Sequence, residues 1–244
     1  MPRAPHSQQL QLLTVAELDA RLLRLRQEAK THPLLAAVAG ENETLAKLEK
    51  RRLRLAEEAA QYNACADRIG AQAETKSALA AKKEERLRAG VGMDSRELLA
   101  LQNEIGTLRG QIAQLEEKQL EAMEAAEENG SAQKELALLR RRAEETKSAL
   151  EKDLSLALEE NRRQTEEIKL RREQIYAQLD EDLRDAYENA RAAGAPAVIG
   201  LYRNGQSTGG VELPSSEVAR IRALDPDEIY LCEEYGCIVV PLDA

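Results

Sequence analysis

Phenylalanine and tryptophan are absent from the sequence, and only six tyrosines are present. Five of these tyrosines stand at position 176 or later, so the first 170 residues must cohere through leucine, isoleucine and alanine. This composition is typical of a coiled coil and argues against an ordinary globular core built on large aromatic side chains.

The sequence also lacks a run of about twenty apolar residues, the length that a membrane-spanning helix needs. Its first residues contain no apolar segment followed by a secretory cleavage site. The three cysteines are an odd number at no disulfide-framework spacing, which fits a reducing compartment. We therefore predict a cytoplasmic protein that does not insert into a membrane.

Catalytic residue patterns are scarce as well. The only two histidines, His6 and His32, stand near the N-terminus, and neither a Gly-x-Ser-x-Gly motif nor a histidine-bearing metal motif occurs. The glycine-rich segment 205–210 lacks the Lys-Ser/Thr pair of a phosphate-binding loop, which favours a simple turn. The sequence therefore predicts a protein that is not an enzyme and needs no cofactor.

What the sequence does contain is a heptad repeat. Asp94 and Glu97 form a capping-box pattern at the start of a long helix. Gaps of three and four residues then separate the apolar positions of a left-handed coiled coil: Leu98, Leu101, Ile105, Leu108, Ile112 and Leu115. A weaker repeat precedes them: Leu45, Leu48, Arg52, Leu55, Ala59, Tyr62, Ala66, Ile69 and Ala73.

These repeats predict a mainly α fold, a long antiparallel coiled-coil hairpin over residues 1–193. Its tip is expected near 89–94, where glycines can reverse the chain, and a break is expected near Pro33. Asn129-Gly130 is a candidate bend. The short tip favours pairing within one chain, although the repeat alone leaves a monomer and a homodimer open.

If residues at equal distances from position 91 face each other in the hairpin, the sequence also predicts which charged residues pair. Lys83 then falls near Glu104, and Glu41 and Glu43 fall opposite residues 140–142. The repeat Leu18, Leu22, Leu25 and Ala29 predicts that residues 1–32 fold back on the helix around 150–175.

Charged residues along the hairpin form two neighbouring bands of opposite sign, which could select a partner through their field. The basic band contains Lys47, Lys50, Arg51, Arg52, Arg54, Arg140, Arg141 and Arg142. The acidic band contains Glu57, Glu58, Asp67, Glu116, Glu117, Glu121, Glu124, Glu127 and Glu128.

Residues 194–244 predict a small α+β module. Strands are expected at 198–202, 229–232 and 237–240, with a turn at Asn204-Gly205 and a short helix from 214 to 224. With few large apolar residues, the module is expected to pack on the helix end near Ile175, Leu179, Leu183 and Tyr187.

Two stretches of the chain resemble the bacterial C4-type zinc-ribbon proteins that carry a long coiled-coil hairpin. One is the tip segment 94–105, and the other is the tail around Glu212-Leu213-Pro214. The resemblance implies two Cys-x-x-Cys knuckles that hold zinc. In this sequence the four ligand positions are Gln206, Gly209, Cys232 and Tyr235, so we predict a degenerate ribbon without metal.

The resemblance further implies an adaptor or chaperone, with partners in transcription or secretion machinery. Asp94, Arg96 and Glu97 at the tip are candidate partner-binding residues, although capping explains the two carboxylates without a partner and is the favoured interpretation. The alternative function is nucleic-acid binding by the basic band. The net charge of −9 argues against it, as does the presence of only one aromatic residue, Tyr62, near the band.

Overall fold

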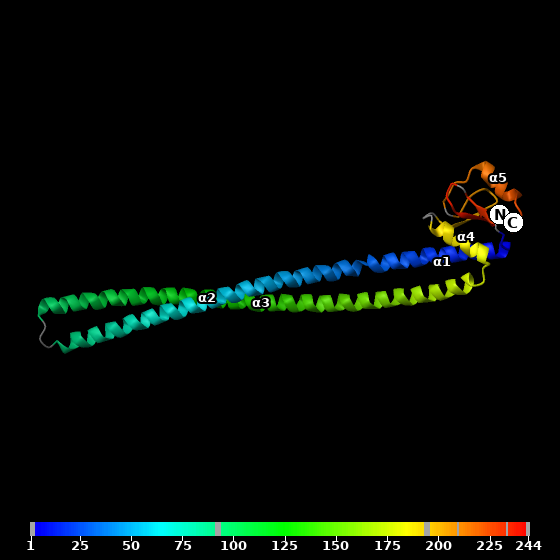
Figure 1. Cartoon of the computed structure of the whole chain (residues 1–244). Helices are drawn as coiled ribbons and strands as arrows, with labels where there is room; N and C mark the ends of the chain where they lie inside the picture. The colour runs from blue at the N-terminus through cyan, green and yellow to red at the C-terminus, as the bar shows by residue number, and fades with distance from the viewer. Residues whose placement is uncertain (1–2, 91–93, 193–195, 209, 233, 243–244) are drawn as a thin grey trace. The chain divides into compact units, whose positions relative to one another are not determined.

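The computed structural model describes residues 3–90, 94–192, 196–208, 210–232 and 234–242. Four helices come first, then a small sheet with one further helix (Figure 1). The elements in chain order are α1 (His6–Lys30), α2 (Pro33–Ala89), α3 (Ser95–Tyr176), α4 (Glu181–Ala192), β1 (Val198–Leu201), α5 (Ser215–Ala223), β2 (Tyr230–Leu231) and β3 (Ile238–Pro241).

The chain divides into two compact units. Unit 2 contains residues 36–151, and unit 1 contains residues 1–35 together with 152–244. The predicted boundary at 193/194 therefore does not coincide with the division in the structure. Within unit 1, Leu12 of α1 and Ile175 of α3 pack in one cluster with Ile238 and Val240 of the C-terminal sheet.

The helix ends follow local sequence signals. The first long helical stretch stops at Lys30, and α2 begins at Pro33, where the missing backbone N–H falls at a helix N-terminus and leaves no bond unmade. The predicted break near Pro33 is confirmed. At the other end of α2, Gly90 has φ +57°, a left-handed conformation that favours glycine after a helix.

Unit 2 is an antiparallel pair formed by α2 and α3, and its seam follows the predicted heptad. Leu101 and Ile105 on α3 and Ile69 on α2 are buried. The spacing of three and four residues continues along α3 through Leu136 and Ala143, both of which are also buried. Alanines also occupy buried positions of the two helices: Ala66, Ala73, Ala80 and Ala143.

The stagger of the two helices differs from the prediction. Lys83 Nζ lies 2.6 Å from Glu104 Oε2, as expected. Arg140, however, contacts Glu49 at 3.5 Å rather than Glu41 or Glu43. Paired residues are thus equidistant from about position 94, not 91, because interdigitation of the seam side chains sets the stagger.

Asn129-Gly130 is not a bend that interrupts the helix, since α3 is continuous through it. Asn129 occupies a seam position and is only 6% exposed. Its amide nitrogen donates to Glu58 Oε2 at 3.2 Å, and its oxygen accepts from Gln133 Nε2 at 2.7 Å. A buried asparagine at such a position specifies helix register rather than bending the helix.

In unit 1, α1 packs on the outer part of α3, as the leucine repeat predicts. Leu22, Leu25 and Ile168 form a buried cluster. Asn161 Nδ2 donates to the backbone oxygen of Leu25 at 3.0 Å. A second contact lies further along, where Arg172 binds Asp19 through two hydrogen bonds of 2.7 and 3.1 Å.

The chain turns sharply after Tyr176, at a point that contains neither glycine nor proline and that the sequence did not reveal. Leu179 is 3% exposed and belongs to the core below the sheet. The first turn of α4 is held by α1, because Gln8 Oε1 accepts from the backbone nitrogen of Asp180 at 2.8 Å. A contact between residues 172 positions apart therefore lies at the junction of α3 and α4.

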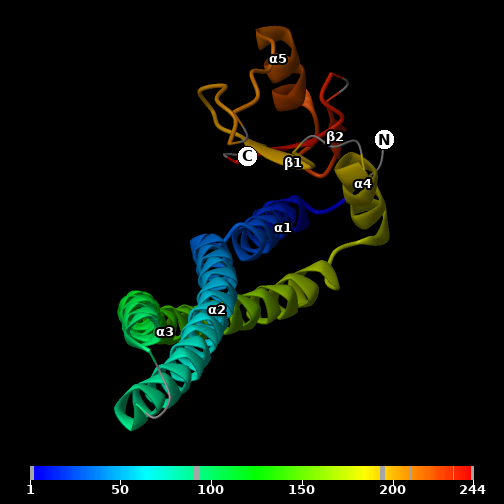
Figure 2. The same cartoon turned by 90° about the vertical axis from the view of Figure 1, so that its left-hand side faces the viewer.

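The sheet has the order β1-β3-β2, with β1 parallel and β2 antiparallel to β3. Figure 2 shows it lying between α5 on one side and α1 with α4 on the other. Alternate strand residues face the two layers. Ile238 and Val240 pack with Leu12 of α1 and Leu183 of α4, whereas Val239 packs toward α5. The predicted packing of the module on the helix end near Leu179 and Leu183 is confirmed.

Candidate interaction surfaces

The tip of the hairpin contains the predicted capping box. Asp94 Oδ1 accepts from the backbone nitrogens of Arg96 and Glu97 at 2.9 and 2.8 Å, and Glu97 Oε2 accepts from the nitrogen of Asp94 at 3.2 Å. The capping interpretation is confirmed. Residues 91–93 of the predicted tip lie outside the described residues. A partner-binding role for Asp94, Arg96 and Glu97 stays a prediction.

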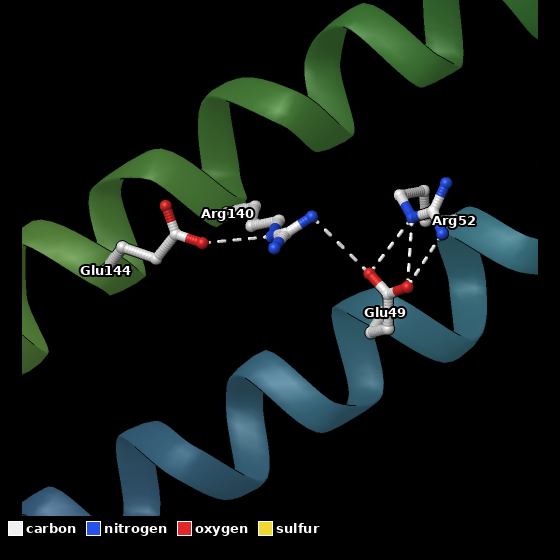
Figure 3. A network of polar contacts seen from close by, with 4 residues as sticks. All are labelled: Glu49, Arg52, Arg140 and Glu144. Carbon is white, nitrogen blue, oxygen red and sulfur yellow. Dashed lines mark hydrogen bonds and ion pairs between the residues drawn. The ribbon is translucent and has the colours of Figure 1, made fainter.

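Four of the eight cations in the basic band hold ion pairs with neighbouring carboxylates. Glu49 binds Arg52 at 2.8 Å and Arg140 at 3.5 Å, and Arg140 also binds Glu144 at 3.0 Å (Figure 3). Hydrogen bonds from Arg52 lower the pKa of Glu49. The remaining pairs are Lys47 with Glu43 and Arg141 with Glu145.

The other half of the basic band points to solvent. Lys50, Arg51, Arg54 and Arg142 are exposed, and in the described parts of the chain no carboxylate lies within ion-pair distance of them. Exposed cations of this kind are stabilised by water alone. They are therefore available to carboxylates or phosphates of a partner without first breaking an internal ion pair.

The acidic band is less neutralised than the basic one. None of its carboxylates takes part in an ion pair among the described residues, and Glu58 accepts a hydrogen bond from Asn129 only. Two cations lie close by in the sequence: Lys118 within the second stretch and Arg68 directly after the first. Neither forms an ion pair with them in the described structure. Like charges gathered in this way lower the stability of a helix pair, so the band stabilises the fold little.

Sequence reasoning did not identify a shallow hollow in the acidic band of unit 2. Met123, which is 54% exposed, lies in it beside the small residues Ala126, Gly130 and Ala132. Four carboxylates and one cation, Lys134, line the same hollow; the carboxylates are Glu124, Glu127, Glu128 and Glu135. The only sequence signal for it is the run of small residues at 130–132 within a glutamate-rich helix.

The residues at the predicted ribbon positions differ in chemistry from the four thiolates that bind zinc. Cys232 and Cys237 form the two sides of a tight hairpin, in which Cys232 N donates to Cys237 O at 2.8 Å. Gln206 lies in an exposed turn whose partners are Asn204 and Tyr202. Gly209 lies outside the described residues. Two thiols, an amide and a phenol do not make the donor set of a tetrahedral zinc.

Both cysteines of the hairpin are fully buried. Burial, followed by the neighbouring Cys232, raises the pKa of the Cys237 thiol to about 11. This raised pKa disfavours the thiolate at neutral pH, which makes Cys237 a poor nucleophile. In the described part of the chain no three His, Cys, Asp or Glu residues gather closely enough to hold a metal ion.

Two long helices joined through a heptad seam, with exposed charge along their arms, define a coiled-coil hairpin protein. The chain belongs to the CT398-like coiled coil hairpin domain family, which matches residues 15–195. The match ends before β1, so the resemblance of the C-terminal module to a zinc ribbon stays a prediction.

Relatives of similar length cover nearly the full chain. The uncharacterized proteins MT2288 and Rv2229c of Mycobacterium tuberculosis are each 29% identical to it over 250 residues, covering 99% of this chain and 98% of the relative. A solved protein of Mycobacterium smegmatis is 25% identical, with a TM-score of 0.67 over 98% of this chain and all of that one.

CT398 of Chlamydia trachomatis shares the fold at 17% identity, with a TM-score of 0.70 over 97% of this chain and 98% of that one. In the portion of the chain that the structure describes, every helix is too short or too polar to traverse a bilayer.

Proposed function

We propose that this chain is a non-enzymatic, cytoplasmic adaptor that binds another protein through the charged arms of its hairpin. The observation that carries the proposal is the direct neighbourhood in unit 2 of an acidic band without ion pairs among the described residues and a basic band of which Lys50, Arg51, Arg54 and Arg142 point to solvent. An acidic band that destabilises its own helices, with an exposed Met123 inside it, is expected where a partner supplies the opposite charge.

The spacing of the bands favours protein over nucleic acid as the partner. Arg54 and Glu57 are three residues apart on α2, which is about 4.5 Å along the helix axis. Charges at this distance lie well within the screening length of roughly 8 Å at physiological salt. A polyanion on the basic band would therefore be repelled by the acidic band, whereas a protein surface can carry alternating charge to match both.

Nucleic-acid binding through Lys50, Arg51, Arg54 and Arg142 is the second candidate, and their lack of ion pairs in the described structure favours it. The stretch of α2 from Lys47 to Arg54 extends over only about 10 Å. Binding through phosphates alone would lose affinity steeply with rising salt and would not depend on base sequence.

The nature of the partner follows from the resemblance alone, which implies a component of transcription or secretion machinery. We also propose that the C-terminal module is a zinc ribbon that has lost its metal. Its two apolar layers around β1 and β3 supply packing in place of the metal that would hold the fold of a zinc ribbon.

The test is a pull-down from lysate in parallel with and without nuclease, using the full chain and two triple variants. One variant neutralises the acidic band by E124Q, E127Q and E128Q. The matched control neutralises three exposed carboxylates of α3 outside the band, by D153N, E159Q and E173Q.

We expect a discrete protein to survive nuclease on the full chain and the control variant, and to be lost on the acidic-band variant. Retention of nucleic acid that is lost in a R51Q, R54Q and R142Q variant would overturn the proposal in favour of the second candidate. Equal loss from both carboxylate variants would show that net charge, not the band, governs binding.

A further inference from the structure

A cavity of about 310 Å³ lies in unit 1 between α5 and the sheet, at the carboxyl ends of the parallel strands β1 and β3. Its walls include Leu201, Ile221, Leu224 and Val239, which belong to the apolar cluster between the sheet and α5. Ligands of open α/β sheets bind in this position, beyond the carboxyl ends of parallel strands. The cavity offers space for one bulky apolar side chain.

The cations of the C-terminal module converge on this cavity. Residues 194–244 contain eight acidic residues and only three basic ones, Arg203, Arg220 and Arg222. Arg203 and Arg222 line the cavity. Arg220 stacks over the ring of Tyr230, another lining residue, with 5.2 Å between its guanidinium carbon and the ring centroid. An acidic module has thus placed all its positive charge around one hollow.

Carboxylates at the cavity are partly neutralised within unit 1. Asp225, one of two acidic lining residues, pairs with Arg3 at 2.7 Å. Hydrogen bonds from the backbone of Asp227 and from Arg3 lower the pKa of Asp225. This pairing offsets the charge of Asp225, whereas Glu228, the other acidic lining residue, keeps its negative charge at the cavity.

Tyr202 also lines the cavity and is 46% exposed. An exposed tyrosine beside arginines at an apolar pocket is the composition found at binding hot spots, where an aromatic anchor and charge-assisted hydrogen bonds act together. Each such feature alone is common on protein surfaces. Here they occur at one hollow, with the charge sign opposite to that of the surrounding module.

We propose that this cavity binds an acidic peptide segment of a partner protein, with one bulky apolar side chain in the hollow and flanking carboxylates on Arg203 and Arg222. The site lies in unit 1, whereas the charged bands lie in unit 2. It goes beyond the adaptor proposal and does not depend on it. Because the chain carries a net charge of −9, unspecific electrostatics would repel such a peptide.

The absence of tryptophan from the chain permits a direct test with the full-length protein. The probe is the blocked peptide acetyl-Glu-Glu-Trp-Glu-Glu-amide, whose tryptophan emission is read without background from the protein. The neutral probe acetyl-Gln-Gln-Trp-Gln-Gln-amide isolates the charge. The acidic peptide with alanine in place of tryptophan, added as a competitor, isolates the apolar anchor.

We expect saturable, blue-shifted emission for the acidic peptide and affinity roughly tenfold weaker for the neutral one, equivalent to about 1.4 kcal/mol. R222Q should weaken binding by at least about threefold, in line with one exposed charge pair. Y202A should weaken it as well, since it removes an exposed side chain without uncovering the core. R171Q, an equal change at an exposed arginine of unit 1, should leave binding unchanged.

Near-UV circular dichroism of each variant establishes that unit 1 is folded. Equal affinity for the acidic and neutral peptides, equal effects of R222Q and R171Q, or no saturation by any peptide would each overturn the proposal. Displacement of the acidic peptide by a single-stranded oligonucleotide more readily than by unlabelled acidic peptide would also overturn it, and would identify the hollow as a nucleotide site.

Discussion

Replacing Tyr187 by phenylalanine removes one hydroxyl from the interior of unit 1 and leaves the ring in place. Tyr187 is 1% exposed, and its hydroxyl donates to Asp19 Oδ2 at 2.8 Å, which joins α4 to α1. A hydrogen bond to a charged acceptor contributes about 1.5–3 kcal/mol. Arg172 remains bound to the same carboxylate in the variant, so we expect Y187F to lower the free energy of unfolding by about 1–2 kcal/mol.

The dependence of stability on pH provides a second test of the contact between Tyr187 and Asp19. Burial, followed by the hydrogen bond to Asp19, raises the pKa of Tyr187 above its ordinary value. A group with a raised pKa in the folded state contributes its full stability below the unfolded pKa, about 10 for tyrosine, and loses it as pH rises toward the folded pKa. Phenylalanine does not titrate, so the stability gap between wild type and Y187F should narrow above about pH 10.

Urea denaturation followed by near-UV circular dichroism of the tyrosines measures this effect, because Tyr62 alone among the six lies in unit 2. Y176F is the matched control. The hydroxyl of Tyr176 donates to Glu188 at 3.0 Å in a more exposed place, so this variant should lose at most about 0.5 kcal/mol of unfolding free energy. Equal free energies of unfolding for Y187F, Y176F and wild type would refute the reasoning. A difference between wild type and Y187F that stays constant at alkaline pH would also refute it.

Two further predictions concern the seam and the thiols. N129L should raise the free energy of unfolding by about 1 kcal/mol in urea melts, because a desolvated amide is replaced by an apolar side chain, and a fall of that size would show that the amide network stabilises the seam. A thiol reagent should modify Cys65, which is partly exposed, much faster than buried Cys232 and Cys237. The fast phase should vanish in C65S, and rapid modification of two or more thiols in the folded chain would contradict their burial.

Some of the interaction surfaces can be predicted from the sequence, whereas others form only through the tertiary structure. The capping box at Asp94 and Glu97 and the basic band are local patterns, and the structure confirms the cap. Which cations of the band are paired depends on side-chain geometry across α2 and α3, and Arg140 shows this in its contacts with Glu49 and Glu144. The cavity beside α5 joins segments 201–203, 221–230 and 239–241, whose proximity no local pattern encodes.

The sequence by itself determined the helices of the hairpin, the break before Pro33 and the approximate strands of the C-terminal module. These features depend on periodic apolar positions, caps and punctuating residues, which act within a few residues of each other. Tertiary structure alone decided the end of α3 at Tyr176, the stagger of the hairpin and the packing of α1 on the C-terminal sheet. Their causes are contacts such as that of Gln8 with Asp180, between residues 172 positions apart.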